Sequence, residues 1–137
     1  MKHLFIFSIA ILMSVTAFSQ QSKLLVPTTG KTIKVLVKEV KKKNAYLIDV
    51  RTPEEYKEDN LKFSKNIDYK SANFKAGIDS LDKNKAVYLY CRSGNRSGKA
   101  LEILKTEGFT KVYNIGGFKD LVKLGLPTQN KIVAEIK

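Results

Sequence analysis

The chain has 137 residues, the length of one domain, and its 25 lysines and arginines against 13 acids give a net charge of +12. A basic balance of this size favours a solvated lysine-rich surface, or the attraction of small anions or an acidic partner. His3 is the only histidine and Cys91 the only cysteine, so a chain that loses its first residues has no His base, Ser-His-Asp triad, His-ligated zinc or resolving thiol.

The N-terminus has the pattern of a secretory signal. Lys2 and His3 form a short basic region, and residues 4–18 carry no charge. As a helix this run would reach about 22 Å, which is short for a bilayer core of about 30 Å. Ala17-Phe18-Ser19 then matches the small-x-small cleavage pattern. We predict a signal peptide over residues 1–19, cleaved after Ser19 or Gln20, and an exported protein, periplasmic or secreted, without stable membrane insertion after cleavage. An uncleaved membrane anchor is the alternative.

Residues 20–31 contain Pro27 and Gly30 and predict a leader or linker, with Lys23–Val26 as a candidate short edge strand. Apolar residues then recur at i, i+3, i+4 and i+7, which predicts an amphipathic helix ending before Asn44: Ile33, Leu36, Val37 and Val40.

The rest of the chain alternates strand and helix signals. Short apolar runs predict buried strands at residues 45–50, 86–90 and 111–115, and a weaker strand is expected near 66–68. Thr52, Pro53 and Glu55 form a capping box at a helix start, and further helices are predicted over 71–81, 95–108 and 118–124. This alternation predicts an α/β fold with a mostly parallel sheet of about five strands and helices on both faces. We expect one domain over residues 32–130 and a C-terminal tail over 131–137.

In such sheets, ligands bind beyond the carboxyl ends of the strands. One strand leads to Arg51, and another leads to Cys91 and the loop that follows it. Gly94 permits a tight turn there, and successive backbone N–H groups can line an anion site at the start of the next helix. The predicted loop site comprises Cys91, Arg92, Ser93, Gly94, Asn95, Arg96 and Ser97.

The energetics of this loop allow a thiolate without a base. Lowering a thiol pKa by two from its ordinary value of about 8.5 needs roughly 2.7 kcal/mol. A helix N-terminus supplies about 0.3–2 kcal/mol, and each hydrogen bond to a charged group about 1.5–3 kcal/mol. The same donors would stabilise a Cys91 persulfide, whose outer sulfur is also negative, so two-step sulfur transfer is the predicted chemistry.

Three segments resemble the rhodanese-like domain family: LIDVRTPEEY (47–56), YCRSGNRSGKA (90–100) and GFTKVYNIGGF (108–118). The resemblance covers about residues 32–128. It implies the three-layer rhodanese fold and thiosulfate-type sulfurtransferase activity, with Cys91 as the persulfide carrier and residues 92–97 as the loop that binds the transferred sulfur and its donor. It also implies that Asp49 and Arg51 form a structural or site-flanking pair.

Other functions remain open at this point. A persulfide carrier or binding module with little turnover would use the same cysteine. A cysteine phosphatase or arsenate reductase needs Arg after five intervening residues, where this chain has Ser97 and places Arg96 one position early. Thiol redox work would need a small-molecule thiol as resolving partner.

The expected partners are a small anionic sulfur donor, such as thiosulfate, and a thiophilic acceptor such as cyanide, a thiol or a protein. We expect no metal, no cofactor and no nucleic-acid partner.

Overall fold

The computed structural model describes residues 30–130. The predicted signal peptide, most of the predicted leader with its candidate strand at Lys23–Val26, and the predicted tail lie outside this range. The elements in chain order are α1 (Gly30–Lys41), β1 (Ala45–Asp49), α2 (Pro53–Glu58), β2 (Lys65–Asn66), α3 (Phe74–Asp79), β3 (Ala86–Cys91), α4 (Asn95–Thr106), β4 (Val112–Gly117) and α5 (Phe118–Lys123). Helix α1 begins at Gly30, inside the segment predicted as leader.

The strands form one parallel sheet in the order β2-β1-β3-β4. The predicted α/β fold with a parallel sheet is confirmed. The described residues contribute four strands, slightly fewer than the expected five or so. Strand β2 has only two residues, so it is an edge strand of minimal length.

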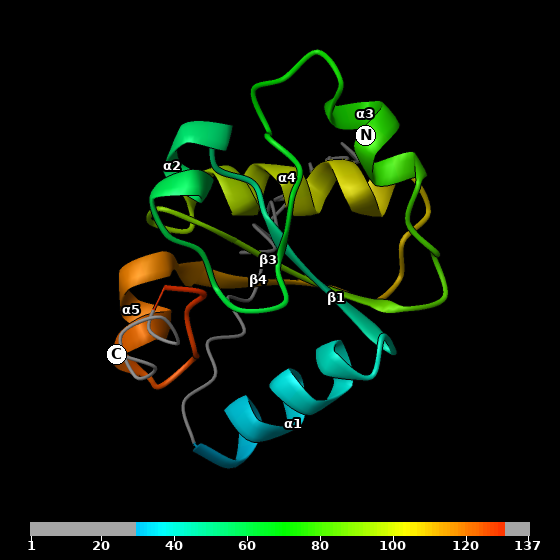
Figure 1. The fold of residues 1–137 in the computed structure, drawn as a ribbon. Coiled ribbons are helices and arrows are strands. Elements are labelled where there is room, and N and C mark those ends of the chain that lie inside the picture. Colours follow the sequence, from blue (N-terminus) through cyan, green and yellow to red (C-terminus); the bar gives the residue numbers. More distant parts are fainter. Residues whose placement is uncertain (1–29, 131–137) are drawn as a thin grey trace, which may run out of the picture.

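Two apolar clusters cover the two faces of the sheet, as strand side chains alternate between them. On one face Leu47 packs with residues of α1 and α5, such as Leu36 and Leu121. On the other face Ile48 packs with residues of α3 and α4, such as Ile78. Figure 1 shows the same division, with α1 and α5 on one side of the sheet and α3 and α4 on the other. Cys91 belongs to the cluster beneath α3 and α4.

The capping box at the start of α2 is confirmed. The Glu55 backbone N–H donates to Thr52 Oγ1 at 3.4 Å, and the Thr52 N–H donates to a Glu55 carboxylate oxygen at 3.1 Å. Helix α4 is bounded by two glycines of positive φ: Gly94 before its first residue and Gly108 two residues after its last, both at φ 91°. Only glycine adopts this left-handed backbone conformation without a steric cost. The two glycines therefore favour the observed start and end of α4.

Parallel strands bring their carboxyl ends to one edge, which places Asp49, Cys91 and Gly117 at neighbouring strand ends. Gly117 approaches the loop after Cys91 very closely: a Cβ there would lie 2.7 Å from the Arg92 carbonyl oxygen. The described residues contain no helix long and apolar enough to cross a membrane, and no cluster of side chains suited to hold a metal ion.

The close approach at Gly117 predicts that Gly117→Ala is destabilising although its backbone φ of −99° suits any residue. The added methyl must push the backbone of Arg92 away, and overpacking of this kind costs about 1–3 kcal/mol. Urea denaturation measures the change. Gly30→Ala is the control, because a Cβ there meets no atom within 4 Å. Equal free energies of unfolding for the two variants would contradict this reading.

Candidate active site

Cys91 is the last residue of strand β3. It is almost fully buried, with 1% of the residue exposed. Its sulfur accepts two hydrogen bonds, from the Gly94 backbone N–H at 3.1 Å and from the Ser97 hydroxyl at 3.5 Å. The loop therefore folds back over the sulfur, with its donors turned inward.

These donors decide the ionisation of the thiol. Burial by itself raises the pKa of Cys91, because it disfavours the charged sulfur. Hydrogen bonds from the Ser97 hydroxyl and from the backbone N–H groups of Ser97, Ser93 and Gly94 act in the opposite direction. The hydrogen bonds prevail, and the pKa of Cys91 lies below its ordinary value. No base takes part in this balance.

Asn114, which the sequence analysis did not single out, ties the loop to strand β4. Its Nδ2 donates to the Gly94 carbonyl at 2.9 Å, and its Oδ1 accepts from the Gly116 N–H at 3.1 Å and from the Ser97 hydroxyl at 2.8 Å. Ser97 has one hydroxyl proton for two acceptors, the sulfur and Asn114 Oδ1. The only signal for Asn114 in the sequence was a polar residue within an otherwise apolar strand.

Arg96 is held by Glu55, a residue for which the sequence predicted only a role in the capping box. Its guanidinium binds the Glu55 carboxylate in a two-pronged contact, at 2.7 Å and 2.9 Å. This contact is the main reason that the pKa of Glu55 falls from 4.5 to about 2. Glu55 likewise contributes most to raising the pKa of Arg96, and the neighbouring Cys91 adds to the rise. Arg96 thus lies near the sulfur, with its charge largely compensated.

The remaining loop residues face outward. Arg92, Ser93 and Asn95 are exposed. Within residues 30–130, the structure records no ion pair for Arg92. Arg92 is therefore the uncompensated cation of the loop.

Asp49 and Arg51 form a buried pair at the carboxyl end of β1. Arg51 Nη2 lies 2.6 Å from Asp49 Oδ2 and also donates to the Asp59 carbonyl at 2.7 Å. The guanidinium stacks over the Phe118 ring, 4.4 Å from its centre. Of the contacts recorded for this pair, none reaches the Cys91 sulfur. The pair ties the end of β1 to the segment after α2 and to α5.

Comparison with known proteins places this geometry in a family. The model of the Rhodanese-like domain matches residues 32–124. The Thiosulfate sulfurtransferase PspE of Escherichia coli is 42% identical over 74 residues, which are 54% of this chain and 71% of that protein. The Uncharacterized protein YqhL of Bacillus subtilis is 38% identical over 78 residues, 56% of this chain and 60% of that protein.

Among solved structures, one described as rhodanese with anions from E. coli superposes with a TM-score of 0.53 at 38% identity, covering 61% of this chain and 95% of that chain. An uncharacterized protein from Saccharomyces cerevisiae superposes with a TM-score of 0.56 at 28% identity, covering 68% and 89%. Because the family model spans most of the chain and solved relatives share its fold, the chain belongs to the rhodanese-like domain family.

Proposed function

We propose that this protein is a thiosulfate-type sulfurtransferase that carries sulfur as a Cys91 persulfide. The observation that carries the proposal is the sulfur of Cys91, which accepts the Gly94 N–H at 3.1 Å and has a lowered pKa. The name of the E. coli relative, a thiosulfate sulfurtransferase, supports the choice of donor. A thiolate is the attacking form of cysteine in such reactions.

The reaction has two half-reactions in which atoms and electrons balance. The Cys91 thiolate attacks the outer sulfur of thiosulfate, the sulfur–sulfur bond of the donor breaks, and sulfite leaves with the electron pair. An acceptor nucleophile, cyanide or a thiolate, then attacks the outer sulfur of the persulfide. The Cys91–sulfur bond breaks, its electron pair returns to Cys91, and no outside oxidant or reductant is needed.

The loop residues divide the work in this proposal. Backbone N–H groups of residues 93, 94 and 97 stabilise the thiolate and then the persulfide. Arg92, exposed and uncompensated, attracts the anionic donor. Glu55 and Asn114 are positioning residues, because they act on the sulfur through Arg96 and Ser97. Asp49 and Arg51 support the carboxyl end of β1.

The geometry disfavours phosphate chemistry as an alternative. A phosphatase loop needs an arginine at position 97, with its guanidinium free to bind the phosphate. This chain has Ser97 there, which is buried and donates a hydrogen bond to Asn114. Arg96, one position earlier, already has its fork on Glu55. A persulfide carrier with slow turnover uses the same loop, and it differs from the enzyme only in the rate of the second half-reaction.

We also propose that the protein is exported, because residues 1–19 have the pattern of a signal peptide. Cysteines of exported proteins usually occur in pairs, so the single cysteine of this chain fits a reactive thiol rather than a structural disulfide. The intact mass of the protein purified from its host reports the cleavage site directly.

Incubation with thiosulfate is expected to add about 32 Da to the protein, the mass of one sulfur atom, and cyanide is expected to remove it with release of thiocyanate. Intact-mass spectrometry measures both steps. Cys91→Ser should show no adduct, whereas Ser93→Ala, whose side chain faces outward, should retain it. An equal adduct on Cys91→Ser would sink the proposal. An adduct that forms but turns over slowly would identify the carrier.

Glu55→Gln is expected to lower the free energy of unfolding at pH 7 by about 1–2 kcal/mol, because it removes a partly screened ion pair. The folded-state pKa of Glu55 is about 2 against an ordinary 4.5, so the stabilisation is complete above pH 4.5 and is lost as the pH falls towards 2. The difference between wild type and variant should therefore shrink over that interval. Urea denaturation at several pH values measures it.

The matched control is Glu54→Gln, which removes an exposed carboxylate from the same helical turn. As a readout of positioning, Glu55→Gln should also lower kcat/KM for thiosulfate at pH 7, and Glu54→Gln should not. Equal effects of the two variants on stability and rate would mean that Glu55 has no special link to the loop.

A further inference from the structure

A groove unrelated to the cysteine loop runs between helix α1 and the segment after α5. Its volume is about 670 Å³, within the range of ligand-binding sites in proteins. We call it the α1 groove. It is lined by Ile33, Lys34, Val37, Lys38, Lys41, Lys42, Gly125 and Pro127.

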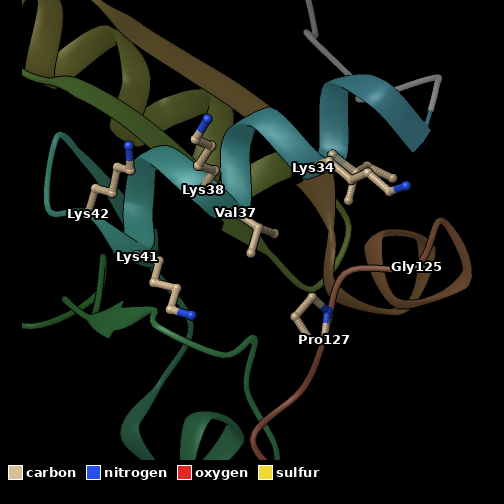
Figure 2. A pocket seen from close by; sticks show the side chains of 8 residues that line it. Lys34, Val37, Lys38, Lys41, Lys42, Gly125 and Pro127 are labelled. Atoms are coloured by element: carbon tan, nitrogen blue, oxygen red, sulfur yellow. The ribbon is translucent and has the colours of Figure 1, made fainter.

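The wall of the groove opposite α1 contains Gly125 and Pro127, and backbone hydrogen bonds hold this segment in place. The Lys62 N–H donates to the Pro127 carbonyl at 2.8 Å, and the Leu126 N–H donates to the Leu121 carbonyl at 3.0 Å. Figure 2 shows Val37 and Pro127 facing each other across the opening. The groove is thus preformed, with an apolar floor.

The rim of the groove is basic and uncompensated. Four of its eight lining residues are lysines and none is acidic. In the described part of the chain, no ion pair is recorded for these four lysines. Glu39, the acid of α1, accepts a hydrogen bond from Asn44 instead. Lysines spaced three and four residues apart on one helix repel each other, so an anionic occupant would relieve this repulsion.

Apolar residues lie between the rim lysines: Ile33, Val37 and Pro127. An apolar groove rimmed by charged side chains is typical of a site of interaction with a partner.

We propose that the α1 groove binds an acidic amphipathic helix of a partner protein. The rim lysines extend from Lys34 to Lys42, a length of about 12 Å or two helical turns. A partner helix laid along α1 would present apolar side chains at i, i+3 or i+4, and i+7 to the floor, and its flanking carboxylates to the lysines. The contact goes beyond sulfur transfer and does not depend on Cys91.

The probe is a fluorescein-labelled synthetic peptide of about 15 residues, near the minimum length for an isolated helix. It carries leucines at helical spacing and glutamates beside them. A second peptide has the same composition with the leucine spacing scrambled. Fluorescence anisotropy with the purified chain at physiological salt should show at least about tenfold tighter binding of the amphipathic peptide.

Two charge reversals of equal size separate the groove from general attraction. Lys34→Glu with Lys41→Glu should weaken binding at least about tenfold. Lys70→Glu with Lys105→Glu, exposed lysines outside the α1 groove, should leave it unchanged. Val37→Asn should also weaken it without any change of charge, and thermal melting checks that each variant folds. Cys91→Ser should bind as wild type does, so failure of the sulfurtransferase proposal and failure of this one are distinguishable.

Several results would overturn the proposal. Equal weakening by both charge reversals, or equal binding of both peptides, would mean non-specific attraction to a basic protein. Phosphatidylglycerol vesicles that bind through Lys34 and Lys41 and displace the peptide would identify a membrane surface as the occupant. Self-association that the Lys34 and Lys41 reversal abolishes would identify a second copy of the chain. Peptide affinity that rises when residues 131–137 are removed would identify that segment as the occupant.

Discussion

The buried Cys91 thiol, whose pKa the loop lowers in spite of burial, is the feature on which the rest of this structure depends. Covering Cys91 almost completely disfavours its ionised form, and the described residues contain no histidine to compensate. The structure compensates with hydrogen-bond donors from the loop, chiefly the Ser97 hydroxyl and the backbone N–H groups around Gly94. Gly94 turns with a positive φ, Gly117 leaves room for the Arg92 backbone, and Asn114 fixes both the loop carbonyl and the Ser97 hydroxyl.

The three arginines around the strand ends differ in how their charge is used. Arg51 is neutralised by Asp49 at the carboxyl end of β1, and Arg96 is neutralised by Glu55. Arg92 is exposed, and no ion pair is recorded for it within residues 30–130. In the proposed mechanism the Glu55 contact holds Arg96 in the loop, and Arg92 attracts the anionic donor.

Local signals in the sequence predicted the elements well. The capping box at Thr52, the glycines at the ends of α4 and the short apolar strands each act over a few residues, and the structure has them where expected. The four strands expected within the described residues are present, although β2 has only two residues, and the fifth candidate, Lys23–Val26, lies outside the described residues.

The partners of the loop were not predictable from local signals. Glu55 contacts Arg96 across 41 positions of sequence, and Asn114 contacts Ser97 across 17. The capping box already gave Glu55 a role at the start of α2. Nothing in the sequence therefore indicated its second contact, with Arg96. Cys91 and the backbone donors could be inferred because they lie within one loop. The catalytic roles of these residues remain predictions.

The pKa of the Cys91 thiol tests the central claim most directly. The ultraviolet absorbance of the thiolate, recorded against pH with Cys91→Ser as the blank, gives this value without any substrate. The account predicts a midpoint below the ordinary thiol value of about 8.5, because the loop donors outweigh burial. A midpoint at or above about 8.5 would contradict it, since burial would then prevail and the thiol would need a base, and residues 30–130 contain no histidine.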